Sequence, residues 1–184
     1  DKVDKRGLVC IGLILLGCAG LFFGFLNLQI ASKNIMIPNY IMGLGMGLCM
    51  VPIINLSLET LSNIQMTNAS GIQNLLKNIG SAVGTSLVAT MLTRFSQIHQ
   101  YMMVGNLSDL NPVYVERVQA TTAALSQYVH VSVANYMAQY SQYGTLVKQA
   151  TLWAFMDSFR IFGLLCFILV PLLLLLKSDK NMNG

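Results

Sequence analysis

Two polar residues near the start of the last apolar stretch are the clearest candidates for charge chemistry in this sequence. Asp157 and Arg160 are three residues apart, so their side chains can pair on one face of a helix. An ionisable residue inside a membrane helix indicates function, because a charge in lipid is costly. Both residues lie near the helix opening, and an ion pair in water at the membrane surface is therefore the alternative interpretation.

A second polar group surrounds the start of the third apolar stretch. Gln73 with Lys77, and Asn74 with Asn78, are four residues apart and share helix faces. One interpretation is a gate contact facing other helices, and the other is an ordinary interfacial helix start with a snorkelling lysine. Thr67 or Asn68 is expected to cap this helix. The candidate polar residues are Asn68, Ser70, Gly71, Asn74, Lys77 and Asn78.

Residues typical of enzyme or metal chemistry are scattered in this sequence. The four cysteines lie in apolar stretches without CxxC spacing, and His99 and His130 are isolated from each other. The sequence has no HExxH motif and no phosphate-binding P-loop. We therefore expect no enzyme, no metal site and no cofactor, and any transport is expected to use an ion gradient rather than ATP.

Composition places these residues in a membrane protein. Of 184 residues, 54% are hydrophobic and only 10% are charged, against about 25% charged in soluble domains. Four stretches reach the roughly 20 residues that cross a hydrocarbon core. The sequence therefore predicts an all-α polytopic membrane protein. The net charge of +4, without a basic patch, gives no indication of nucleic-acid binding. The predicted spans are 8–28, 36–58, 72–94 and 150–176, flanked by terminal segments 1–7 and 177–184.

Small residues recur at helical spacing within these spans. Gly80 and Gly84 are four residues apart, a pattern that lets membrane helices approach closely. Gly43, Gly45 and Gly47 thin one face of the second span, with Gly43 and Gly47 as the packing candidates, and Pro52 is expected to kink it. The kink is either a pivot or a static bend. In the first span, Gly20 and Gly24 form a similar pair, alongside Gly12 and Gly17.

Residues 95–149 are predicted to form an extracytoplasmic loop. The stretch is polar, and Asn111–Pro112 breaks any helix before it. Beyond the break, apolar and aromatic residues at three- and four-residue steps predict an amphipathic helix. Its tyrosines suit either the membrane interface or a protein partner. The periodic residues are Val118, Thr122, Leu125, Val129, Tyr136 and Tyr140.

The basic residues predict that both termini lie in the cytoplasm. Four spans place the termini on one side, and that arrangement gives six basic residues inside and four outside. Arg117 lies deep in the long loop, where a basic residue has little influence on the orientation of the helices in the membrane. The inner set is Lys2, Lys5, Arg6, Lys77, Lys177 and Lys180, and the outer set is Lys33, Arg94, Arg117 and Lys148.

Three motifs resemble one transporter family. Residues 68–85, NASGIQNLLKNIGSAVGT, resemble the opening of the penultimate helix in EmrB/QacA-type drug:proton antiporters, the fourteen-helix branch of the major facilitator superfamily. The family usually has Arg at the position of Lys77 and often Gly at that of Ser81. Residues 43–52 are similar to the glycine-rich preceding helix, and residues 157–160 resemble the start of the last helix.

The resemblance covers nearly the whole chain but only the last four helices of the family. It implies that the chain is the C-terminal part of a multidrug efflux antiporter in the inner (plasma) membrane. In such an antiporter, two helical bundles rock around a central site. It implies export of lipophilic compounds in exchange for protons, with the proton-carrying acids largely in helices that this sequence lacks. The implied partners are the lipid bilayer, the remaining N-terminal helices, a periplasmic adaptor protein and an outer-membrane channel.

The beginning of the chain fits the same interpretation. No methionine precedes Asp1, and the apolar stretch after Arg6 is longer than a signal-peptide core. We therefore expect a piece of a longer transporter. The alternative is a four-helix accessory or assembly membrane protein without transport activity of its own. The sequence identifies neither the substrate nor the coupling ion nor the oligomeric state.

Overall fold

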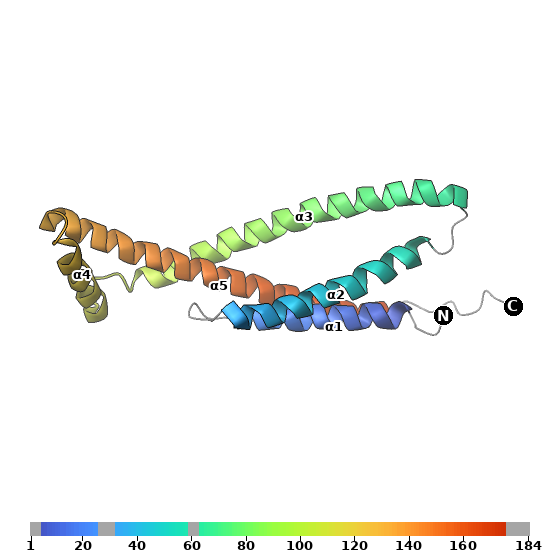
Figure 1. The fold of residues 1–184 in the computed structure, drawn as a ribbon, viewed down its shortest axis with the longest axis horizontal. Helices are drawn as coiled ribbons and strands as arrows, with labels where there is room; N and C mark the ends of the chain where they lie inside the picture. Colours follow the sequence, from blue (N-terminus) through green and yellow to red (C-terminus); the bar gives the residue numbers. More distant parts are fainter. Residues whose placement is uncertain (1–4, 26–31, 59–62, 176–184) are drawn as a thin grey trace. The chain divides into compact units, whose positions relative to one another are not determined.

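The computed structural model describes residues 5–25, 32–58 and 63–175, all of which are helical or in short turns (Figure 1). The predicted all-α class is confirmed. Within the described residues, four helices are long and apolar enough to cross a membrane. The helices are α1 (Lys5–Phe23), α2 (Ser32–Leu58), α3 (Asn63–Val104), α4 (Pro112–Leu125) and α5 (Val131–Leu175).

The chain divides into two compact units, and each is described separately. The first unit comprises residues 1–87 and 156–184, and the second comprises residues 88–155. In the first unit α1 and α2 lie side by side (Figure 1). They run antiparallel, because Gly12 faces Gly45 while Val9, earlier in α1, meets Cys49, later in α2.

The same reasoning places α5 antiparallel to α1 in the first unit. Gly17 of α1 lies against Phe167 of α5, and Gly20 lies against Gly163. Because the residue numbers rise along α1 as they fall along α5, the two helices run in opposite directions. The core of this unit is therefore built where α1 meets the other two helices, and it includes Val9 and Ala19, which are 1% and 0% exposed.

The second unit packs along an alanine stripe on α5. The residues of this stripe repeat every four positions, or a multiple of four, which keeps them on one side of a helix. The small side chains of its four alanines let neighbouring helix backbones approach closely. Tyr136 and Tyr140 lie on the other side, 72% and 70% exposed, although we predicted them on the same periodic face as the buried Val118. The stripe is Ala134, Ala138, Leu146, Ala150 and Ala154.

The start of α4 follows from its sequence. Asn111 adopts an extended backbone, and its side-chain oxygen accepts a hydrogen bond from the Val113 N–H at 3.1 Å. Pro112 occupies the first turn, where a missing N–H costs nothing. The break predicted at Asn111–Pro112 is therefore present, and a second break separates α4 from α5 at residues 126–130.

Two helices extend beyond the spans that we predicted from apolar length. α3 runs over Asn63–Val104 rather than 72–94, and α5 begins at Val131 rather than near 150. The cap predicted at Thr67 or Asn68 is wrong, because both residues lie inside α3 and the Ser70 hydroxyl donates to the Thr67 carbonyl at 2.8 Å. Polar residues continue a helix as readily as apolar ones, so hydropathy marks membrane length and not helix ends.

Candidate functional site

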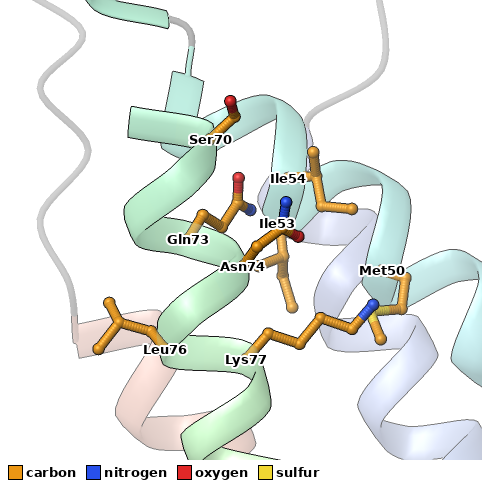
Figure 2. Close-up of a pocket in the computed structure, with 8 residues that line it drawn as sticks. All are labelled: Met50, Ile53, Ile54, Ser70, Gln73, Asn74, Leu76 and Lys77. Atoms are coloured by element: carbon orange, nitrogen blue, oxygen red, sulfur yellow. The ribbon is translucent and has the colours of Figure 1, made fainter. Parts of the chain in front are cut away.

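A groove between α2 and α3 contains the main polar group that the sequence singled out (Figure 2). It has a volume of about 540 Å³ and lies within the first unit. One wall is apolar and comes from the last turns of α2, and the other is mostly polar and comes from the first half of α3. The lining residues are Met50, Ile53, Ile54, Ser70, Gln73, Asn74, Leu76 and Lys77.

Helical spacing explains why the two walls differ. Ser70, Gln73, Asn74 and Lys77 lie at steps of three and four residues, so they form one stripe along α3. The apolar residues of α2 in the groove follow the same spacing. The groove thus brings a polar stripe and an apolar stripe together, which suits an amphipathic occupant.

Lys77 is the one charged side chain among the described residues that line this groove. Its side chain is exposed and extends from α3 toward Met50 of α2 (Figure 2). Among the described residues it has no ion-pair partner. A lysine amine without a carboxylate next to it leaves three hydrogen-bond donors for an anion or for water.

The structure brings together some of the predicted polar residues and not others. Ser70, Asn74 and Lys77 line the groove, whereas Asn68, Gly71 and Asn78 lie elsewhere on α3. The gate role that we predicted for this group stays a prediction. The apolar wall of Met50, Ile53 and Ile54 was missed, although its spacing after the glycines of α2 offered a signal.

Close contacts of glycines join α1 to α2. A Cβ added to Gly12 would lie 2.9 Å from the Gly45 carbonyl oxygen and 2.6 Å from the Cys49 sulfur. The Cys49 thiol also lies 3.6 Å from the carbonyl oxygen of Val9, a weak hydrogen bond across the two helices. Of the three glycines that thin one face of α2, the one that contacts α1 is therefore Gly45.

The predicted small-residue candidates themselves face open space in this chain. Gly43, Gly47, Gly80 and Gly84 have no atom within 4 Å of an added Cβ, among the residues that the structure describes. Their role in packing stays a prediction that involves a partner outside these helices. Pro52 is buried within the continuous helix α2, and its pivot role also stays a prediction.

A second set of contacts joins α1 to α5. A Cβ on Gly20 would lie 3.0 Å from both the Gly163 Cα and the Phe159 carbonyl oxygen. A Cβ on Gly163 would lie 2.9 Å from the Gly17 carbonyl oxygen. These neighbours are backbone atoms, which cannot rotate away as a side chain can. The backbones meet here because both helices lack a side chain at the crossing.

Asp157 and Arg160 form the ion pair that their spacing predicted. The Arg160 guanidinium donates to the Asp157 carboxylate at 3.0 Å, and the two side chains are 29% and 35% exposed for Asp157 and Arg160 respectively. The Arg160 guanidinium carbon lies 5.4 Å from the centre of the Phe25 ring, and its side chain crosses directly over Gly24. Arg160 therefore links α5 to the end of α1 as well as to Asp157.

Replacing Arg160 with glutamine is expected to destabilise the protein by about 1 kcal/mol. A partly exposed ion pair and a partly exposed cation–π contact each contribute less than about 1 kcal/mol, and the variant loses both. Thermal unfolding of the purified full-length protein measures the effect. Arg94→Gln is the matched control, because Arg94 is exposed on α3 without an ion pair among the described residues. Equal losses in the two variants would contradict this assignment.

The described part of the chain has no group of three or more metal-binding side chains. Cys10, Cys18, Cys49 and Cys166 are free thiols in the apolar helices.

Curated proteins similar to this chain are bacterial transporters. The chain is 28% identical over 179 residues to the colistin resistance protein EmrB of Acinetobacter baumannii, which covers 97% of this chain and 34% of that protein. The chain is a homologue of EmrB-type transporters. The probable multidrug resistance protein EmrY of Escherichia coli is 24% identical over 62% of this chain and 22% of its own length.

A third similar protein is the uncharacterized MFS-type transporter YhcA of Bacillus subtilis, 25% identical over 83% of this chain and 28% of that protein. The chain thus spans about a third or less of the length of these relatives. No family model and no solved structure matches it. The EmrB-type relationship agrees with the resemblance of the motifs at residues 43–52, 68–85 and 157–160.

Proposed function

We propose that this chain is the C-terminal part of a secondary active multidrug efflux transporter that exports lipophilic compounds in exchange for protons. The observation that carries the proposal is the similarity to the EmrB-type proteins over nearly the whole chain. Three of the similar proteins are named for multidrug resistance or multidrug export. Four helices of membrane-spanning length support the same proposal.

The exposed face of α3 supports the idea of a larger protein. None of the described side chains from Gln65 to Val104 is buried, although the helix is apolar enough to cross a membrane. In a bilayer, small residues on such a face favour contact with another helix, because lipid does not drive helices together. Additional transporter helices would supply that contact.

The close crossings of α1 with α2 and α5 suit one half of a rocking transporter. Backbones that meet at glycines resist sliding, so these three helices would move as one body. The proposed setting is the inner membrane, with both termini in the cytoplasm. A periplasmic adaptor and an outer-membrane channel are proposed partners, with the exposed Tyr136 and Tyr140 as the contact, and crosslinking from these two positions tests that contact.

Drug accumulation in cells tests the proposed activity. The full-length protein is expressed in a bacterial strain that lacks its own efflux pumps, and uptake of a fluorescent lipophilic cation is followed. We expect cells with the protein to accumulate less of the dye than vector controls. Addition of a protonophore is expected to abolish this difference. Export that persists with the protonophore but stops on ATP depletion would contradict proton coupling, and accumulation equal to the vector control would contradict efflux.

A four-helix accessory protein is the second candidate function. The exposed face of α3 would then contact a separate membrane protein instead of further helices of the same chain. The length of the native polypeptide separates the two candidates, because an accessory protein needs no further spans.

A further inference from the structure

The groove between α2 and α3 has the chemistry of a site for an anionic amphiphile. Among the described residues that line it, Lys77 is the one cation and none carries a carboxylate. Asn74 and Gln73 add amide N–H donors on the same wall, while Met50 and Ile53 supply apolar surface on the other. An occupant that matches both walls carries a negative, hydrogen-bond-accepting head and an apolar tail.

The depth of Lys77 along α3 fits a membrane interface. The span that we predicted begins at residue 72, five residues before Lys77, or about 7 Å along the axis at ~1.5 Å per residue. Side chains on a helix tilt toward its N-terminus, and lysine amines snorkel toward water. With the span placed as predicted, the amine would reach the level of the lipid headgroups, with the polar residues of the groove around it.

We propose that this groove binds an anionic phospholipid of the membrane, with the headgroup phosphate at Lys77 and an acyl chain along Met50, Ile53 and Ile54. Charge complementarity selects a phospholipid with a net negative headgroup over a zwitterionic one. Basic pockets between membrane helices bind such headgroups in general. The proposal requires only that α2 and α3 lie in a bilayer, so it does not depend on proton coupling or on efflux.

Lipid retention by the full-length protein tests the site. The protein is purified, and native mass spectrometry measures its affinity for phosphatidylglycerol and for phosphatidylcholine. Lys77→Gln is expected to weaken phosphatidylglycerol binding about five-fold, the effect of one basic residue near a headgroup. Phosphatidylcholine binding is expected to weaken less, because the choline cation already offsets the phosphate charge. Lys77→Arg keeps the positive charge and is expected to retain the phosphatidylglycerol affinity of the unmodified protein.

Arg94→Gln is the matched control, because Arg94 is an exposed cation of the same helix outside the groove. It is expected to bind phosphatidylglycerol as the unmodified protein does. An equal loss for Arg94→Gln would mean general surface attraction and would overturn the site. Unchanged phosphatidylglycerol affinity in Lys77→Gln, with a lower unfolding temperature, would place a protein carboxylate at Lys77 and would overturn it too.

Discussion

Replacing Gly20 with alanine is expected to destabilise the protein, whereas the same replacement at Gly144 is expected to be neutral or slightly stabilising. At Gly20 the new methyl group would lie 3.0 Å from the Gly163 Cα and the Phe159 carbonyl oxygen. Both are backbone atoms of α5, so relief requires that α1 and α5 move apart. Overpacking of this kind costs about 1–3 kcal/mol.

At Gly144 the methyl group meets nothing within 4 Å among the described residues. Alanine is a better helix former than glycine by about 1 kcal/mol, so the sign of the effect should reverse at this position. Thermal unfolding and membrane abundance of the full-length protein measure both variants in parallel. Equal behaviour of the two variants would show that α1 and α5 do not cross at Gly20 and Gly163.

Replacing Gly84 with leucine is expected to abolish efflux by the full-length transporter at unchanged membrane abundance. No described atom lies within 4 Å of an added Cβ at Gly84, so the contacts among α1, α2 and α5 have room to persist. The leucine would instead block the close approach of a helix outside this chain to the small residues of α3. A packing penalty of about 1–3 kcal/mol there is large enough to prevent the productive arrangement.

Gly84→Ala is the matched control for this variant. Alanine keeps the face small, so we expect most of the efflux to survive. Drug accumulation is compared at equal amounts of membrane-inserted protein, measured by immunoblot. Full efflux by Gly84→Leu would mean that this face of α3 contacts lipid alone, and the small residues would then have no packing role.

The sequence predicts the membrane architecture because lipid imposes a simple rule on composition. Apolar stretches of sufficient length identify the four spans, since each must satisfy its backbone internally in lipid. It does not predict the ends of α3 and α5, because polar residues such as those at 95–104 and 131–149 continue these helices. Apolar composition identifies the part of a helix that contacts lipid. It does not show where the helix continues outside the membrane.

The local pairings illustrate a second limit of sequence reasoning. The ion pair of Asp157 with Arg160 follows from a spacing of three residues within one helix. The crossing of Gly20 with Gly163 does not, because it depends on which points of two distant helices meet. Gly45 and Gly43 are equally small, yet only Gly45 faces α1. Spacing identifies a face, and the fold decides what the face contacts.

The length of the native polypeptide tests most directly whether this chain is part of an EmrB-type transporter. It is measured by intact-mass spectrometry of the protein isolated from membranes of its source, together with the coding region upstream of Asp1. We expect a polypeptide about three times as long as this chain, since the chain covers 34% of the EmrB protein of Acinetobacter baumannii, with about ten further apolar spans upstream. A native protein of only four spans would contradict the transporter assignment and favour the accessory protein.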